Sequence, residues 1–194
     1  MIEAYNLTKK YNNQVALSRL NLRVNRGEFV FIIGPSGSGK STLLKLIMRE
    51  IVPTSGVLKI FGRNTSRLRR GQVSLLRRNV GMVFQEFRLL DEKTVYENVA
   101  FAMRVTGVPA NEMQKRAHIA LGLVGLENKL DCPATELSGG EQQRVGIARA
   151  IVNKPSIIIA DEPTGNLDPQ NTFEIMYLLN EIHKAGTTVV VATQ

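Results

Sequence analysis

The stretch "FVFIIGPSGSGKSTLL", residues 29–44, constrains the fold most, because it joins an apolar strand to a helix through a glycine-rich loop. Its spacing matches G-x-x-x-x-G-K-[ST]. Glycines let backbone N–H groups turn toward a phosphate, and a helix starting near Lys40 points its positive dipole end at the same anion. The sequence therefore predicts a nucleotide-phosphate site formed by Gly34, Pro35, Ser36, Gly37, Ser38, Gly39, Lys40, Ser41 and Thr42.

Within this loop, Lys40 supplies a charge for the β- and γ-phosphates, and the Ser41 hydroxyl is a ligand for Mg²⁺. The alternative is a turn that only connects strand and helix. It is disfavoured because the strand, the loop and the helix all fall where the motif requires them. The spacing also differs from the G-x-G-x-x-G of dinucleotide-binding folds.

A second acidic site follows the buried strand in "SIIIADEPTGNLD", residues 156–168. A carboxylate at such a strand end, beside a phosphate loop, can hold Mg²⁺, and this predicts Asp161 as a metal ligand. Glu162 is predicted to orient the water that attacks the γ-phosphate, or to accept its proton. The alternative interpretation is that both are ordinary surface carboxylates. The phosphate loop upstream makes this alternative much less favoured.

Hydrophobic periodicity divides the chain into an α/β core and a helical insertion. Strands are expected at residues 2–7, 16–24, 28–33, 56–61, 79–85 and 156–160 and at the end of the chain. Helices are expected at about 40–50, 94–106, 111–124, 138–153 and 169–184. We therefore expect one domain over 1–194, with a β-subdomain and phosphate-loop core at 1–85, a helical insertion at 86–137, the helix at 138–153, and the rest of the core at 154–194.

Bulk composition fits a globular chain with 194 residues, 43% of them hydrophobic and 22% charged. No apolar run approaches the about 20 residues that a membrane span needs, and the N-terminus has no secretory pattern. The single cysteine, Cys132, allows no internal disulfide and suits a reducing cytoplasm.

The net charge is +8, and six arginines fall between Arg63 and Arg78. Charge runs are usually solvated surface, which is the favoured interpretation. The sharper hypothesis is a patch that faces an anionic membrane. No DNA- or RNA-binding motif accompanies the charge, so a nucleic acid partner is not expected.

The stretch "LSGGEQQRVGIARA", residues 137–150, begins with an S-x-x-E capping box and two glycines that leave helix N–H groups open to an anion. Together with the phosphate loop and "DEPTGNLD", it closely resembles the ATP-binding subunits of ABC transporters, over the whole chain. The resemblance implies a P-loop NTPase of the ABC ATPase type, with a RecA-like core, an N-terminal antiparallel β-subdomain and a helical insertion. It also implies ATP and Mg²⁺ as cofactors and an ATP-dependent, head-to-tail homodimer.

Further site residues are implied by this resemblance alone. The partner's ATP would contact the signature at Leu137, Ser138, Gly139, Gly140, Glu141 and Gln142. Tyr11 would stack on adenine, with a core tyrosine as the alternative. Gln85 would touch Mg²⁺ and water. A loop of Asn166, Leu167 and Asp168 would contact the partner subunit.

Within the family, "LLRRNVGMVFQEFRLLDEKTVYENVAFAM", residues 75–103, resembles the cell-division branch. This implies a peripheral protein on the cytoplasmic face of a bacterial plasma membrane, bound to an integral membrane protein and controlling cell-wall hydrolysis. Residues 87–106 would lie where the family's groove accepts the coupling helix of the membrane subunit. Lipoprotein-releasing or export-type ABC transporters are the nearer alternative. A soluble ABC ATPase acting on nucleic acid or ribosomes is disfavoured, because the chain has one such domain and no long coiled coil.

The last residue, Gln194, stands 33 residues after Asp161, where the family has a catalytic switch histidine. Glutamine cannot carry the proton or charge of an imidazole. The family also continues past this position with further strands and helix. We therefore expect a truncated or engineered form that binds ATP and Mg²⁺ but hydrolyses slowly. The two histidines, His118 and His183, are expected at the surface of helices away from the motifs.

Overall fold

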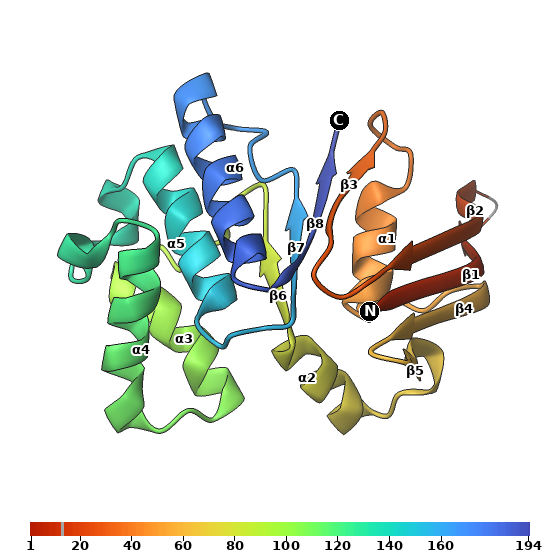
Figure 1. The fold of residues 1–194 in the computed structure, drawn as a ribbon, viewed down its shortest axis with the longest axis horizontal. Coiled ribbons are helices and arrows are strands. Elements are labelled where there is room, and N and C mark those ends of the chain that lie inside the picture. Colours follow the sequence, from red (N-terminus) through yellow and green to blue (C-terminus); the bar gives the residue numbers. More distant parts are fainter. Residues whose placement is uncertain (13) are drawn as a thin grey trace.

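The computed structural model describes residues 1–12 and 14–194, which form two sheets with helices around them (Figure 1). An antiparallel sheet has the strand order β2-β1-β4-β5, and a parallel sheet has the order β3-β8-β7-β6. The strands are β1 (Ile2–Tyr11), β2 (Gln14–Val24), β3 (Phe29–Ile33), β4 (Ser55–Ile60), β5 (Arg63–Asn64), β6 (Val80–Val83), β7 (Ile157–Asp161) and β8 (Thr188–Thr193). The expected α/β class, with an N-terminal antiparallel sheet, is confirmed.

The helices lie around these sheets and are joined by short 3₁₀ turns at Thr65–Arg67, Glu127–Lys129 and Ala134–Glu136. They are α1 (Lys40–Ile47), α2 (Arg70–Arg78), α3 (Val95–Thr106), α4 (Ala110–Leu123), α5 (Gly139–Ile151) and α6 (Pro169–Lys184). None of them, within the described part of the chain, is long and apolar enough to cross a bilayer.

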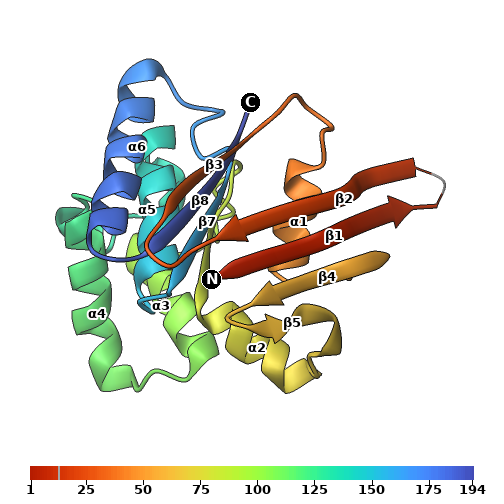
Figure 2. The same cartoon turned by 45° about the vertical axis from the view of Figure 1, so that its right-hand side comes forward.

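Strands β6, β7 and β8 of the parallel sheet are buried on both faces, which explains their unbroken apolar runs, whereas the edge strand β3 leaves Phe31 and Ile33 exposed. Ile157 and Ile159 of β7 pack in one core with α1, which lies between the two sheets (Figure 2). Ile158 and Ala160 face the opposite way, into a core shared with α3, α4, α5 and α6. The sheet therefore separates α1 from α5 and α6, which matters for the site below (Figure 1).

The first helix of the helical insertion, α3, begins after a capping box at Thr94. The Thr94 hydroxyl accepts a hydrogen bond from the Glu97 N–H at 3.2 Å, and the Glu97 carboxylate accepts one from the Thr94 N–H at 3.0 Å. Apolar residues at helical spacing, such as Val95, Val99 and Met103, are fully buried against α4 and α5. This amphipathic pattern is the reason that the sequence predicted α3 as a helix.

Three elements differ from the expectation, because β1 is longer and neither the short strand β5 nor helix α2 was predicted. Strand β1 continues to Tyr11 instead of ending at Leu7, because Asn6 has a φ of 46° and a register shift there breaks the alternation. Helix α2 was not predicted at all. Its sequence "RGQVSLLRR" is amphipathic, but three arginines dominate it and only Leu76 is buried, so the stretch was interpreted as part of a charge run.

Candidate functional site

The predicted phosphate loop and acidic pair meet at one edge of the parallel sheet. Ile33 pairs with Thr193, and Asp161 pairs with Ala192, so strands β3, β7 and β8 all end at this edge. Gln85 follows β6 at the same edge, since Val83 pairs with Ala160. Loops at the carboxyl ends of parallel strands are where ligands bind in such folds.

The phosphate loop packs against β2 through Gly39, the N-cap of α1. Gly39 has a φ of 94°, and a Cβ there would lie 2.3 Å from the Ala16 carbonyl oxygen, so only glycine fits. Lys40 follows and is 7% exposed. Its ammonium donates hydrogen bonds to the carbonyl oxygens of Gly34 at 2.6 Å and Pro35 at 3.2 Å, which hold it inside the loop.

The acidic pair at the end of β7 faces this loop. The Ser41 hydroxyl donates to Asp161 Oδ1 at 3.5 Å, and Glu162 Oε1 lies 3.7 Å from Lys40 Nζ. Burial raises the pKa of the Asp161 carboxyl, and the charge of Glu162 adds to this, against the lowering effect of the Ser41 hydrogen bond. Glu162 adopts a left-handed φ of 45°, which its backbone hydrogen bond to the Ala192 carbonyl helps to maintain.

The oxygen atoms gathered here are suitable ligands for Mg²⁺. The Ser41 hydroxyl and the half-buried Asp161 carboxylate are hard oxygen ligands on adjacent elements. The Gln85 side chain lies beside Gly165, where a Cβ would be 3.0 Å from its amide nitrogen. No group of three or more His, Cys, Asp or Glu residues gathers within 1–12 and 14–194, so phosphate oxygens and water would complete the coordination.

Tyr11 lies at the end of β1, and its side chain is 44% exposed. The Lys9 ammonium sits 5.1 Å from the ring centroid. A core role for this tyrosine is thereby excluded, and the ring is accessible for stacking.

The signature region starts helix α5 with a capping box that includes an ion pair. The Ser138 hydroxyl accepts from the Glu141 N–H at 3.3 Å, and the Glu141 carboxylate accepts from the Ser138 N–H at 2.9 Å. A hydrogen bond from Lys129 and those from Ser138 lower the pKa of Glu141 to about 2.

Only part of the predicted signature faces solvent. Ser138 and Gly139 are exposed, whereas Leu137 and Gly140 are buried. A Cβ on Gly140 would overlap the Asn171 side chain of α6. The Gln142 amide donates to the carbonyl oxygens of Ala134 and Leu137, which ties it to the preceding turn.

The structure does not bring the signature and the phosphate loop together within one chain. They lie on helices α5 and α1, on opposite faces of the parallel sheet (Figure 1). The loop of Asn166, Leu167 and Asp168 contacts Gln85 and the start of the signature helix. Asn166 donates to the Gln85 carbonyl oxygen at 3.4 Å, a Cβ on Gly139 would lie 3.7 Å from Leu167, and Asp168 caps α6 through the Asn171 N–H at 3.0 Å.

Two side chains of α5 that the sequence analysis gave no separate role hold these loops in place. Gln143 is fully buried and donates to the Pro163 carbonyl oxygen at 2.6 Å, just after the acidic pair. Arg149 donates to the carbonyl oxygens of Phe87 at 2.7 Å and Arg88 at 2.5 Å. Both of those residues have left-handed φ angles, of 39° and 51°. No local pattern marks either contact, because each joins distant segments.

His118 is exposed on α4, as expected, and His183 on α6 is partly exposed. Its ring is half-buried, with Nε2 2.9 Å from the Gly27 carbonyl oxygen and an edge-on contact to Phe29. Gln194 is exposed at the end of β8.

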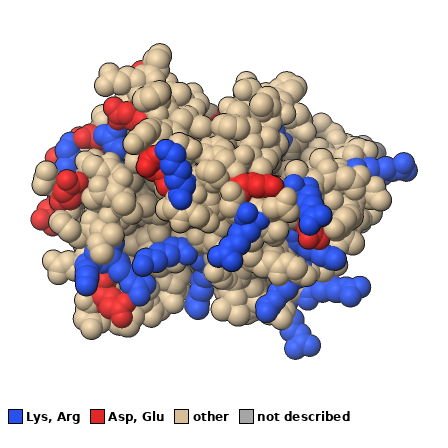
Figure 3. Space-filling model, viewed as in Figure 1, with Lys and Arg blue, Asp and Glu red and all other residues tan. Residues whose placement is uncertain are grey.

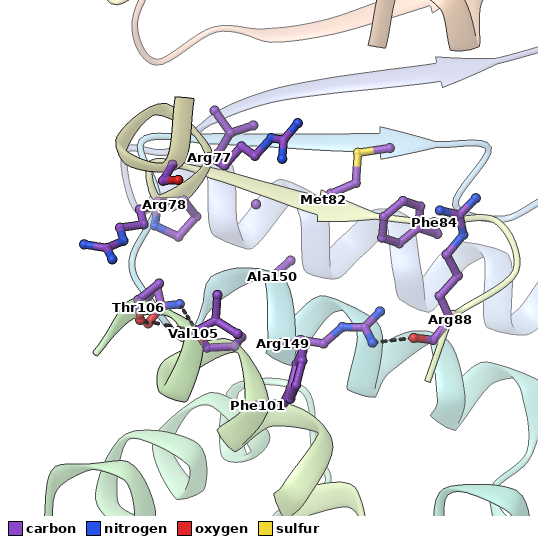
Figure 4. Close-up of a pocket in the computed structure, with 16 residues that line it drawn as sticks. Arg77, Arg78, Met82, Phe84, Arg88, Phe101, Val105, Thr106, Arg149 and Ala150 are labelled. Atoms are coloured by element: carbon purple, nitrogen blue, oxygen red, sulfur yellow. Dashed lines mark hydrogen bonds between the residues drawn. The ribbon is translucent and has the colours of Figure 1, made fainter. Parts of the chain in front are cut away.

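A cavity of about 510 Å³ opens between α2, β6, α3 and α5 (Figure 4). Its apolar walls are Met82, Phe84, Phe101 and Val105. Its charged lining consists of four arginines and no carboxylate, namely Arg77, Arg78, Arg88 and Arg149. Phe101 and Val105 are 48% and 64% exposed, so an apolar surface faces solvent here. Residues 87–106, expected as a groove, supply one side of it.

Comparison with known proteins gives consistent matches. The family model described as "ABC transporter" matches residues 17–165. The chain is 50% identical over its full length to the cell division ATP-binding protein FtsE of Streptococcus pneumoniae serotype 2, of which it covers 84%. It is 44% identical to the protein of the same name from Escherichia coli, of which it covers 87%.

Solved structures show the same fold. The chain aligns over its full length with cbiO1 from Clostridium perfringens, part of the ABC transporter complex cbiONQ, at a TM-score of 0.91 and 35% identity, covering 78% of that chain. It aligns equally fully with the dimeric bacterial ABC transporter cassette MJ0796 at a TM-score of 0.89 and 41% identity, covering 88% of that chain.

Proposed function

Because this chain belongs to the ABC transporter family, as an ABC ATPase of the cell-division FtsE type, we propose that it drives an FtsEX-type membrane complex. ATP with Mg²⁺ closes a homodimer, and hydrolysis reopens it. The membrane protein FtsX receives this motion and controls cell-wall hydrolysis during division. The complex places the chain on the cytoplasmic face of a bacterial plasma membrane, as a peripheral subunit without nucleic acid.

The chemistry rests on the groups around the phosphate loop. Backbone N–H groups of residues 34–42 and the Lys40 ammonium bind the phosphates, and the exposed Tyr11 ring stacks on adenine. Ser41, Gln85 and Asp161 would hold Mg²⁺, which would neutralise phosphate charge. Glu162, held beside Lys40, accepts the proton of the attacking water. Gln194, at the position of a switch histidine, offers only an amide.

A homodimer completes the site because the signature lies on the opposite face of the sheet from the phosphate loop. In the dimer, the exposed start of α5 in one subunit, where the Gly139 N–H points outward beyond the capped Ser138, approaches the γ-phosphate held by the other. The likeness to a dimeric cassette at 41% identity supports this arrangement. The loop from Asn166 to Asp168 contacts the partner subunit beside it.

The cavity beside α3 is the docking groove for FtsX. Its exposed apolar side chains and its four arginines without a carboxylate fit a helical segment that presents apolar residues and an acidic one. Arg149 lines this groove and donates hydrogen bonds to the loop that follows Gln85. Movement of a docked segment is therefore transmitted to the nucleotide site.

The observation that carries this proposal is the 50% identity over the whole chain to a protein named for cell division. The test is co-expression of the tagged chain with the FtsX of the same genome, followed by membrane solubilisation and pull-down. Phe101→Asp should reduce FtsX recovery at least about tenfold, because it buries a charge in an apolar groove. Tyr177→Asp, at a similarly exposed apolar residue on α6, is the control and should retain FtsX.

Nucleotide affinity of both variants verifies that they fold. Recovery of a larger permease in place of FtsX would favour the lipoprotein-releasing or export-type alternative. Equal FtsX recovery by parent and Phe101→Asp would overturn the groove, while the assignment to the FtsX complex would stand.

A further inference from the structure

Residues 51–85 carry seven cations, Lys59 and six arginines, and not one acidic residue. The whole chain has 17 acidic residues in 194, so a stretch of this length would be expected to hold about three. Elsewhere, cations such as Arg116, Lys129 and Arg144 are paired with carboxylates. The charge of this stretch is therefore segregated instead of mixed, unlike an ordinary solvated surface.

Five of the six arginines form one surface, whereas the sixth is an anchor. Arg77 donates to the carbonyl oxygens of Met48 and Arg49 and so fastens α2 to the end of α1. The other five side chains are exposed, and within the described residues none makes an ion pair or a side-chain hydrogen bond. We call them the arginine surface, which consists of Arg63, Arg67, Arg69, Arg70 and Arg78.

The arginine surface follows β5, the turn after it and α2, which lie along the lower edge of the molecule (Figure 1). Lys and Arg side chains gather along this edge in the space-filling view, with few acidic ones between them (Figure 3). Arg78 also lines the cavity beside α3. The arginine surface is thus continuous with the groove in which a membrane subunit is proposed to dock.

Apolar groups lie among these cations. Leu75 of α2 is 51% exposed, between Arg70 and Arg78 in the sequence. Beside it, a hollow of about 310 Å³ is lined by Arg63, Leu68, Gln72 and Leu75, so that a guanidinium, an amide and apolar side chains converge. Cations around an exposed leucine suit the headgroup layer of a bilayer, where charge meets phosphate and the apolar tip enters the acyl boundary.

Nucleic acid fits this surface less well. Among the described residues of this stretch, the large apolar side chains that stand exposed are Val52 and Leu75, and neither is an aromatic ring on which a base could stack. An exposed leucine also gains nothing against a phosphate backbone. The continuity of the arginine surface with the groove for a membrane subunit also favours a membrane over nucleic acid. This part of the argument rests on the proposed function.

We propose that the arginine surface binds anionic phospholipid headgroups of the membrane that carries the partner subunit. Each arginine near an anionic bilayer strengthens binding about fivefold, and several together retain the protein at the surface. The contact orients the groove toward the bilayer and raises the local concentration of the ATPase around its partner. Because it is electrostatic, the contact weakens as salt rises.

The experiment uses the full chain and vesicles that hold no protein, so that its result is independent of FtsX docking. Co-sedimentation is measured with phosphatidylcholine vesicles and with vesicles that contain about 30% phosphatidylglycerol, in low and high salt. The parent should bind only the anionic vesicles. The triple variant Arg67→Gln, Arg69→Gln, Arg70→Gln should bind them about 100-fold more weakly.

The matched control removes the same charge elsewhere, with Lys10→Gln, Arg23→Gln and Arg26→Gln at exposed positions outside the arginine surface. Circular dichroism and ATP affinity verify the folding of both triple variants. An equal loss in the control, equal binding to both vesicle types, or undiminished binding by the Arg67, Arg69 and Arg70 variant would overturn the proposal. So would tighter binding to a DNA duplex than to anionic vesicles at the same salt.

Discussion

Lys40 occupies the centre of the proposed nucleotide site because its own loop holds it there. Its ammonium is nearly buried, bound to two loop carbonyls and close to Glu162. A buried cation with neutral carbonyl partners and one carboxylate is well placed to take up a phosphate, whose charge-assisted hydrogen bonds are stronger.

Lys40→Ala should lower ATP affinity at least about 100-fold, because the phosphates lose their cation and the loop loses its anchor. The measurement is isothermal titration with ATP and Mg²⁺. Lys45→Ala, which removes an exposed cation from the same helix, is the control and should bind within about threefold of the parent. An affinity within about twofold for Lys40→Ala would place the nucleotide elsewhere.

Glu162→Gln should keep ATP affinity and slow hydrolysis about 100-fold or more, because the amide preserves shape but cannot accept a proton. Steady-state turnover and ATP titration separate the two effects. The strained backbone at residue 162 is common to both side chains, so folding should not differ. Hydrolysis at the parental rate would remove Glu162 from the role of base.

Gln194→His should raise turnover about tenfold or more, since an imidazole can hold and pass a proton where the amide cannot. ATP affinity should change little, because residue 194 lies outside the phosphate loop. Parent and variant are compared by phosphate release under saturating ATP. Equal turnover would show that this position does not limit the chemistry here.

At the scale of elements, the start of α5 depends on one carboxylate. Glu141 caps the helix and contacts Lys129, and together these partners lower its pKa to about 2, from an ordinary value of 4.5. A carboxyl whose pKa is lower in the folded state binds fewer protons there than in the unfolded chain. Its contribution to stability is therefore full above about pH 4.5 and is lost as the pH falls toward 2.

Glu141→Gln should accordingly lower the free energy of unfolding by about 1 kcal/mol at pH 7, by weakening the cap. The difference between parent and variant should shrink as the pH falls from 5 to 3. Urea denaturation at both values, followed by circular dichroism, gives these free energies. A difference that stays constant or widens toward acid would contradict the low pKa of Glu141.

On the scale of the whole molecule, the parallel sheet decides that one chain cannot assemble the proposed ATP site. It holds the phosphate loop on the side of α1 and the signature on the side of α5. In the proposed dimer, two copies related head to tail would bring one region of each together, which would make dimerisation dependent on ATP.

Ser138→Arg should block ATP-dependent dimerisation and leave ATP binding by the monomer intact, because the side chain fills the approach to the partner's γ-phosphate. Light scattering with ATP and Mg²⁺ gives the mass, best in the Glu162→Gln background, where ATP persists. Asn128→Arg, at another exposed position of the helical insertion, should dimerise normally. An undiminished dimer in Ser138→Arg would exclude a composite site.

The sequence by itself determined the parts whose chemistry is local. The glycine spacing, the acidic pair after a buried strand and the capping boxes at Thr94 and Ser138 each specify backbone geometry within a few residues. Strands buried on both faces are also recognisable in the sequence as apolar runs. These features were sufficient for the α/β class and for the candidate nucleotide site.

Only the tertiary structure decided which of these parts meet. Ser41 and Asp161 are 120 residues apart, and the order of strands in the sheet brings them together. The contacts of Arg149 with Phe87 and of Gln143 with Pro163 have the same origin. Helix α2 buries a single leucine and is held by Arg77, so its stability lies in contacts outside its own sequence. Local patterns encode backbone preference, whereas such contacts depend on how whole elements pack, which no short stretch records.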